Sequence, residues 1–410
     1  MAHPTPSELL EGLNPEQRAA VESEAAPLRI LAGAGTGKTR VLTRRIAYRA
    51  ATGAIDPRHV LALTFTRKAA GELNARLRSL GLRDAVAAGT FHAVAFAQLR
   101  TRWADRGVTP PTLLERKVGF VARLLPRRAE PFAAVDVVSE IEWAKARDID
   151  PDRYVSAAAA AQRRPSVPPT VVAEVYDRYE REKHKRRVVD FDDLLSLARR
   201  AITSDPELAA AQRWRFRHVF VDEFQDVNPL QFSLLRAWLG DRTDLCVVGD
   251  PNQAIYAWNG ADADYLVRFD HHFPGGDTVE LRRNYRSTPQ VLAAANAVLD
   301  GGRLASGPLV AERGDGTAPR VRRYPTDVAE ASGIARAVRD AHRPGAPWSS
   351  QAVLVRTNAQ IPLIEDALRR AGIPYRTRGG GLLALPEIKA ALRALSASNQ
   401  PLAAALADLA

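Results

Sequence analysis

A strand, a glycine-rich turn and a helix follow one another near the N-terminus, and this unit constrains the fold more than any other part of the chain. The segment 28–32 (LRILA) is apolar enough for a buried strand, and 39–50 (TRVLTRRIAYRA) reads as a helix. Between them, 32–39 (AGAGTGKT) matches a phosphate-binding loop in the context that such a loop requires. We therefore predict an α/β fold in which a P-loop follows a strand of a parallel sheet.

Each part of this loop has a chemical role in holding a nucleotide. Its glycines let backbone N–H groups turn toward phosphates, and the following helix N-terminus adds partial positive charge. Lys38 would reach the β- and γ-phosphates, and the Thr39 hydroxyl would bind Mg²⁺. Ala32 departs from the glycine usual at the first position, and the alternative to a nucleotide site is a chance glycine-rich turn. The candidate cradle comprises Ala32, Gly33, Ala34, Gly35, Thr36, Gly37, Lys38 and Thr39, followed by Arg40.

A second chemical signature, VDEFQD at 221–226, closes another apolar run, HVFVD at 218–222. Asp222 at the end of a strand is placed to hold Mg²⁺ through water, as a Walker-B acid does. Glu223 beside it would orient and deprotonate an attacking water. An acidic loop that merely caps a helix is the alternative, but the P-loop upstream favours an ATP-hydrolysing site that uses ATP and Mg²⁺.

Further apolar runs suggest how the chain is organised. VLALT (60–64) and DLCVVGD (244–250) look like strands of the same parallel sheet, whereas 96–204 has helical patterns and no strand-like run. Farther on, we expect strands of a second sheet at 317–324 and 352–356 and amphipathic helices at 326–342 and 361–372. We expect a helical insertion within the first α/β domain, followed by a second α/β region.

The composition is compatible with several binding partners. The net charge is +11 and the pI about 10.1, and 51 of the 58 basic residues are arginine. This permits attraction to nucleic acid or to an anionic membrane surface, although GC-rich coding also explains an arginine excess. We expect the basic run 181–187 to be a solvated helix face, with nucleic-acid binding as the alternative. The single cysteine, Cys246, should be buried. No apolar run of about 18 residues and no secretory signal is seen, so we expect a cytoplasmic protein.

An ordered series of motifs resembles the UvrD/Rep/PcrA-type DNA helicases of superfamily 1A. The motifs are LNPEQ (13–17), AGAGTGKT (32–39), TFTRKAAGEL (64–73), GTFHA (89–93), DFDDLL (190–195), VDEFQD (221–226), VVGDPNQAIYAWNGA (247–261) and LRRNYRS (281–287). The resemblance implies a RecA-like ATP-binding motor domain formed by residues 1–95 and 205–286. It further implies a helical insertion at 96–204 and a partial second RecA-like domain at 287–410.

The resemblance also assigns roles on the nucleotide side. Gln17 would read the adenine edge, Tyr285 would stack on the base and Arg286 would approach the γ-phosphate. Gln253 would sense the γ-phosphate and couple it to the nucleic-acid-contacting residues that follow. Without the resemblance, Tyr285 would pass for a core tyrosine and Arg286 for a surface arginine.

For the nucleic-acid side, the resemblance implies a single strand held by stacking and by phosphate contacts. Aromatic faces stack on unstacked bases of any sequence, worth roughly 1–3 kcal/mol per base. The stacking residues would be Phe65, Tyr256 and Trp258, and those touching phosphates or sugars would be Thr64, Thr66, Arg67, Thr90 and His92. Arg67 replaces the asparagine usual at its position. In the alternative view Phe65 and Trp258 are core aromatics and His92 is a loop histidine.

The expected activity is ATP-driven 3′→5′ movement on single-stranded DNA and at duplex junctions, in repair or replication. The family's later KGLE motif and γ-phosphate-contacting arginine are not found after residue 376. An arginine of this kind is worth about 10³–10⁵ in turnover, so we expect slow hydrolysis from a truncated chain or a shortened paralogue. The alternative is an ATP-gated single-strand-binding module that does not unwind. A different P-loop enzyme, such as a small-molecule kinase, and an RNA substrate are further alternatives.

Overall fold

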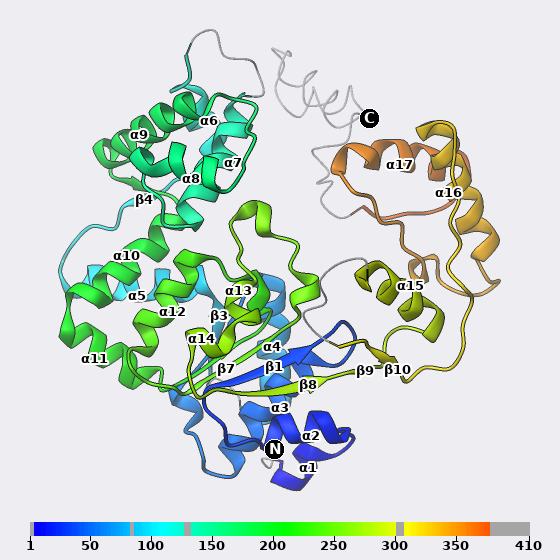
Figure 1. The fold of residues 1–410 in the computed structure, drawn as a ribbon, viewed down its shortest axis with the longest axis horizontal. Helices are drawn as coiled ribbons and strands as arrows, with labels where there is room; N and C mark the ends of the chain where they lie inside the picture. The colour runs from blue at the N-terminus through cyan, green and yellow to red at the C-terminus, as the bar shows by residue number, and fades with distance from the viewer. Residues whose placement is uncertain (1–3, 83–85, 127–132, 301–306, 378–410) are drawn as a thin grey trace, which may run out of the picture. The chain divides into compact units, whose positions relative to one another are not determined.

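A six-stranded, wholly parallel sheet forms the centre of the first part of the molecule (Figure 1). The computed structural model describes residues 4–82, 86–126, 133–300 and 307–377, and it divides into one unit up to Pro319 and another from Arg320. The strands are β1 (Leu28–Ala32), β2 (Val60–Thr64), β3 (Ala87–Thr90), β6 (His218–Val221), β7 (Leu245–Gly249) and β8 (Asp277–Leu281), in the order β3-β2-β6-β7-β1-β8. The predicted parallel α/β fold is confirmed.

Alternating side chains of these strands fill two separate cores, one on each face of the sheet. Ile30 of β1 belongs to one core and Leu31 to the other, as the two-residue period of a strand requires. One face is covered by α1 (Pro6–Leu10), α2 (Pro15–Glu22), α3 (Lys38–Ala51) and α4 (Arg67–Ser79). The other is covered by α5 (Phe91–Asp105), α10 (Phe191–Ser204), α11 (Pro206–Arg215), α12 (Pro229–Leu239), α13 (Asp264–Val267) and α14 (Phe269–His272). Cys246 is buried among these apolar residues, as expected.

Four helices form a group with a core of its own (Figure 1). They are α6 (Lys117–Ala122), α7 (Ala133–Ala146), α8 (Tyr154–Ala160) and α9 (Pro169–Arg186), and β4 (Thr112–Leu113) pairs with β5 (Val188–Val189) where the chain enters and leaves this group. We call this group the insertion. The predicted insertion, 96–204, also contains most of α5 and all of α10, but these two helices pack into the sheet core. The separate core is formed by the four helices α6 to α9. The domain boundaries themselves stay a prediction.

After β8 the chain passes beside the P-loop and forms a short second ladder. There β9 (Arg283–Asn284) pairs in parallel with β10 (Val310–Ala311), and α15 (Pro289–Asp300) lies between them in the sequence. This arrangement places the NYRS motif within hydrogen-bonding reach of the cradle.

The second unit contains α16 (Asp327–Ala341) and α17 (Ile361–Arg370), which confirms the two predicted helices there. They share a small core around Ala335, Leu368 and Ile373. The predicted strands at 317–324 and 352–356 are wrong for the part of the chain that the structure describes, because neither segment is assigned as a strand. Val321 and Leu354 are both 93% exposed, and an extended segment without a hydrogen-bonded partner strand is not stable. None of the described helices is long and apolar enough to cross a membrane.

Candidate functional site

The P-loop turns between the end of β1 and the start of α3 by placing two glycines in the left-handed region. Gly35 has a φ of 73° and Gly37 a φ of 92°, and α3 begins at Lys38 directly after Gly37. A Cβ atom added to Gly35 would lie 2.6 Å from the Cβ of Arg286, so only glycine fits this close approach. The loop therefore directs the N-terminus of α3, with its free N–H groups, toward the space that phosphates would occupy.

The two acidic residues after β6 lie against the first residues of α3. The Thr39 hydroxyl donates to Oδ2 of Asp222 at 3.0 Å, and Lys38 Nζ lies 3.3 Å from Oε2 of Glu223. Burial, with a further effect of the Glu223 charge, raises the pKa of Asp222 to about 6. The predicted catalytic residues Lys38, Asp222 and Glu223 and the predicted metal ligand Thr39 are thus brought together.

A chain of side-chain contacts leads from Glu223 to Gln253. The Gln225 amide donates to Glu223 at 2.9 Å, and its oxygen accepts the Asp250 N–H at 3.0 Å. The Gln253 amide donates to the Asp250 carboxylate at 2.6 Å. Glu223 itself is held with a φ of 53°, which is uncommon for a residue with a side chain and is typical of functional positions. The structure thereby connects the phosphate cradle to the segment that carries Tyr256.

Asp226 lies in the candidate site, although the sequence motifs predict no role for it. One of its carboxylate oxygens is buried without a hydrogen-bond partner in the described part of the chain. Burial, with the nearby Glu223 charge, raises the pKa of Asp226 to about 7. The motifs at 221–226 and 247–261 contain Gln225, Asp226 and Asp250. Nothing in the sequence distinguishes the roles of these three residues from those of neighbouring polar residues.

On the predicted adenine side, α2 is tied to the P-loop. The Gln17 amide is buried and donates to the Thr36 carbonyl at 2.8 Å, while its oxygen accepts the Asn14 N–H at 3.2 Å. The Asn14 amide donates to the Tyr285 hydroxyl at 2.8 Å, and Tyr285 is otherwise half exposed. Gln17 and Tyr285 therefore lie on the same side of the cradle, as their predicted roles require, although adenine recognition itself stays a prediction.

Asn284 and Arg286 approach the P-loop from β9. The Asn284 amide donates to the Ala34 carbonyl at 2.5 Å, and the Tyr285 N–H donates to the Gly35 carbonyl at 2.9 Å. The Arg286 N–H donates to the Asn284 side-chain oxygen. Arg40 instead binds the Gly12 carbonyl, at 3.1 Å, and so connects α3 to the loop between α1 and α2.

A cavity of about 1290 Å³ opens beside the carboxylates, between the ends of the strands and the insertion. Its lining includes Glu223, Gln253 and five of the predicted nucleic-acid contacts, which are Thr64, Phe65, Thr66, His92 and Tyr256. Burial lowers the pKa of His92, so its ring is neutral at physiological pH. Residues remote in sequence therefore share one concave surface next to the candidate catalytic acid.

Three predicted nucleic-acid contacts lie outside the lining of this cavity. Arg67 is exposed at the start of α4, and Trp258 is exposed near Tyr256. The Thr90 hydroxyl caps α5 by accepting the Ala93 N–H. Phe65 packs against Phe91 as well as lining the cavity, so its core role and its predicted stacking role are compatible. Thr64 is buried, and its hydroxyl has no hydrogen-bond partner among the described residues.

The donor set beside the cradle fits a bound ATP and a magnesium ion. Mg²⁺ prefers oxygen ligands, and the Thr39 hydroxyl and the Asp222 carboxylate are adjacent oxygens. The unpartnered buried oxygen of Asp226 is a further acceptor nearby. Burial and the Glu223 charge outweigh the lowering effect of Lys38 on the pKa of both Asp222 and Asp226.

Comparison with known proteins agrees with this geometry. Residues 13–274 match the family model described as the UvrD/REP helicase N-terminal domain, and residues 279–404 match the UvrD-like helicase C-terminal domain. The chain is 44% identical to the ATP-dependent DNA helicase UvrD2 of Mycobacterium tuberculosis, over 98% of this chain and 60% of that protein. It is 34% identical to the ATP-dependent DNA helicase PcrA of Bacillus subtilis, over 91% of this chain and 51% of that protein. The chain thus spans about half to three fifths of the length of these relatives.

Proposed function

The chain belongs to the UvrD/REP helicase family, and on that premise we propose that it is an ATP-dependent DNA helicase or translocase acting on single-stranded DNA. The observation that carries the proposal is that Glu223 belongs both to the phosphate site and to the cavity. This carboxylate contacts Lys38 of the phosphate cradle and also lines the cavity that contains Phe65 and Tyr256. Hydrolysis and strand binding would therefore share one residue and one connected surface.

The proposed roles follow from the positions of the side chains. Thr39 and Asp222 would hold a magnesium ion, which would supply charge neutralisation for the phosphates. Lys38 and the N–H groups of the P-loop would bind the phosphates, and Arg286 would approach the γ-phosphate from β9. Glu223 would leave Lys38 to orient a water and take its proton. Gln253 would respond to the γ-phosphate through Asp250 and Gln225.

On the strand side, Phe65 and Tyr256 would stack on bases inside the cavity, and Trp258 would stack near its rim. Phosphates and sugars would contact Thr64, Thr66, Arg67, Thr90 and His92. The 3′→5′ polarity, the action at duplex junctions and the role in repair or replication rest on the family resemblance and remain proposals. The cytoplasmic location, expected from the sequence, also remains a proposal.

Phosphate release with and without a single-stranded oligonucleotide tests the assignment. Lys38→Ala removes the cation that binds phosphates, and Glu223→Gln removes the base but keeps the shape of the side chain. We expect each variant to lose about 10²-fold or more of the stimulated rate. Glu223→Gln should still bind ATP, because it leaves Lys38 in place.

The exposed ion pair Arg178–Glu174 on α9 supplies matched controls, because it lies away from the cradle. Arg178→Ala and Glu174→Gln should keep the stimulated rate within about twofold, as surface pairs contribute little. Stimulation that survives in Lys38→Ala or Glu223→Gln would show that these residues do not have the proposed roles.

A strand-displacement assay separates the proposal from an ATP-gated binding module. The module would bind single-stranded DNA with an affinity that depends on nucleotide but would not separate a duplex. Robust, ATP-dependent strand separation by the 410-residue chain would exclude the module.

A further inference from the structure

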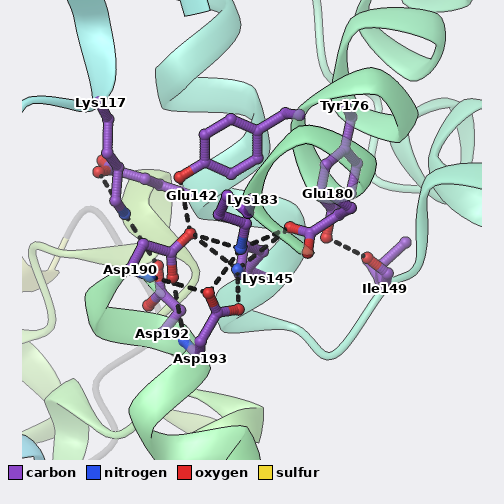
Figure 2. A network of polar contacts seen from close by, with 11 residues as sticks. Lys117, Glu142, Lys145, Ile149, Tyr176, Glu180, Lys183, Asp190, Asp192 and Asp193 are labelled. Carbon is purple, nitrogen blue, oxygen red and sulfur yellow. Dashed lines mark hydrogen bonds and ion pairs between the residues drawn. The ribbon is translucent and has the colours of Figure 1, made fainter. Parts of the chain in front are cut away.

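Lysine ammonium groups are buried among carboxylates where the insertion meets α10 (Figure 2). Lys145 of α7 and Lys183 of α9 each contact the same three acids, which are Asp190, Asp193 and Glu180. The distances from nitrogen to oxygen lie between 2.5 and 3.2 Å. We call these five residues the lysine joint.

The lysine joint is too buried to be an ordinary surface ion pair. Asp190 is fully buried, and its Oδ2 also accepts the Tyr179 hydroxyl at 2.8 Å. Burial alone would lower the pKa of Lys145, but Asp190, Asp193 and Glu180 outweigh burial and hold its pKa well above the usual value. The same cations hold the pKa of Asp190 well below its usual value despite burial. Lys145 and Asp190 are therefore charged at physiological pH, and removing one of them leaves an unpaired buried charge.

The joint connects the insertion to one specific helix of the motor. Asp190 is the N-cap of α10, and Asp193 completes a capping box in its first turn. Negative charge at a helix N-terminus is favourable, so α10 is a natural anchor for the two lysines. Because α10 packs in the sheet core through Leu194 and Ala198, the joint ties α7 and α9 to the motor core.

A third lysine extends this connection to the wall of the cavity. Lys117 of α6 lies 2.9 Å from Glu142 and 3.1 Å from Asp192, and all three residues line the cavity (Figure 2). Phe191, between Asp190 and Asp192 in the sequence, also lines it and lies beside His92, with ring centroids 6.2 Å apart. The residues beside the joint thus form part of the cavity lining, which also includes Tyr256 and Gln253.

We propose that the lysine joint positions the insertion over the strand ends and thereby sets the width of the cavity that receives single-stranded DNA. Lys145 and Asp190 are then positioning residues, because they do not touch the strand themselves. They act on it through the cavity residues Phe191, Lys117 and Glu142. The inference rests on the proposed function for the identity of the ligand, but the positioning itself can be measured without DNA.

Two measurements on the full chain test this proposal. The first is the affinity for a fluorescent single-stranded oligonucleotide, from anisotropy. The second is the distance distribution between spin labels on Ser156→Cys in the insertion and Asp241→Cys in the motor, both exposed sites. The single native cysteine, Cys246, is buried and does not take a label. We expect Lys145→Met to weaken DNA binding at least tenfold and to broaden the distance distribution, while the affinity for ATP changes by less than twofold.

Tyr176→Phe is the matched control. Its hydroxyl donates to the Ile149 carbonyl within the insertion, next to the joint (Figure 2). This variant loses a buried hydrogen bond but should leave both readouts unchanged. Normal DNA affinity in Lys145→Met, or weakened affinity with an unchanged distance distribution, would overturn the proposal.

A double variant distinguishes a loss of positioning from a failure to fold. Lys145→Met with Asp193→Asn removes one buried charge of each sign, and the Asn oxygen can still accept the Asp190 N–H that Asp193 accepts at 2.8 Å. It should fold, judged by cooperative thermal unfolding, and should still broaden the distance distribution and weaken DNA binding. If the unaltered chain binds no DNA, the proposed function fails, whereas the distance distributions alone still decide whether the joint positions the insertion.

Discussion

Asp222 and Asp226 are the two residues whose protonation is most sensitive to what binds beside the P-loop. Their pKa values, about 6 and about 7, exceed the ordinary aspartate value of 3.8 because burial and the Glu223 charge oppose ionisation. A carboxyl group with a raised pKa in the folded state favours folding when it is protonated. This contribution is complete below pH 3.8 and is lost as pH rises through about 6 and about 7.

We therefore predict opposite pH dependences with and without magnesium. In the absence of nucleotide and metal, the contribution of these carboxyls to the free energy of unfolding should fall between pH 4 and pH 7. A cation binds the ionised carboxylates, so added Mg²⁺ with an ATP analogue should raise the melting temperature more at pH 8 than at pH 5. Thermal unfolding at the two pH values measures both effects.

Asp226→Asn isolates one of these groups. The substitution removes an ionised, partly buried carboxylate, so the metal-free variant should melt a few degrees higher than the unaltered chain at pH 8 and show little difference at pH 5. Asp264→Asn, at a partly exposed and ion-paired position with a lowered pKa, should lack this gain. Equal shifts in the two variants at pH 8 would contradict the assignment to Asp226.

At the scale of elements, the strand ends and the loops after them form the aromatic side of the cavity. Tyr256 lines the cavity and is 47% exposed, so its ring is free to stack on a base. We predict that Tyr256→Ala weakens binding of single-stranded DNA by about 1–3 kcal/mol, or roughly 5- to 150-fold. Titration of a labelled oligonucleotide at fixed salt measures this loss.

Trp214 supplies an aromatic control on a different element. It is 61% exposed on α11 and packs edge-on against His59, just before β2, whereas the cavity lies at the other ends of the strands. Trp214→Ala should leave DNA affinity within about twofold. A similar loss in both variants would mean that exposed aromatic rings bind the strand without regard to the cavity.

Elements with a strong local signal could be predicted from the sequence, and those that depend on a distant partner could not. The runs at 28–32 and 60–64 are mostly apolar and become the sheet strands β1 and β2. The run at 352–356 has a similar local character, but neither it nor 317–324 has a partner strand among the described residues. Strand formation depends on pairing, which local composition does not encode.

The same limit applies to the basic run 181–187, for which we expected a solvated helix face. Arg181 and Arg186 are exposed and paired within α9, as that expectation requires, but Lys183 is only 2% exposed. Its partners Asp190 and Asp193 belong to a motif quoted for the family resemblance, yet nothing in the sequence shows that two lysines converge on them. The cradle was predictable because its contacts are local, whereas the joint was not, because α7, α9 and α10 meet only in the folded chain.

At the scale of the whole molecule, the positive net charge of +11 is not concentrated in the cavity. The charged residues lining the cavity are five acids, namely Glu115, Glu142, Asp192, Glu223 and Asp226, and two bases, Arg116 and Lys117. The mostly acidic charges of the lining would therefore not neutralise the phosphates of a bound strand, and arginines outside the cavity would do so.

Arg67 tests this division of labour, because it is exposed at the start of α4 and follows the lining residue Thr66. The logarithm of DNA affinity should fall steeply with the logarithm of salt concentration, by about 0.7 for each phosphate neutralised. We predict that Arg67→Ala reduces this slope by about 0.7, whereas Arg178→Ala leaves it unchanged. A slope that is flat in the unaltered chain would refute phosphate contacts as the main source of affinity.

The pairing of β4 with β5 affects how the sequence and length of the insertion can change in evolution. The chain leaves the motor at Thr112 and returns at Val189, and these segments are hydrogen-bonded neighbours. Among the described residues, no fully buried member of the motor cores comes from between these points, although the partly buried Leu113 packs against one of them. Evolution or engineering can therefore lengthen, shorten or exchange the intervening domain without rebuilding the ATP-binding sheet, provided that the contacts of the lysine joint with α10 are kept.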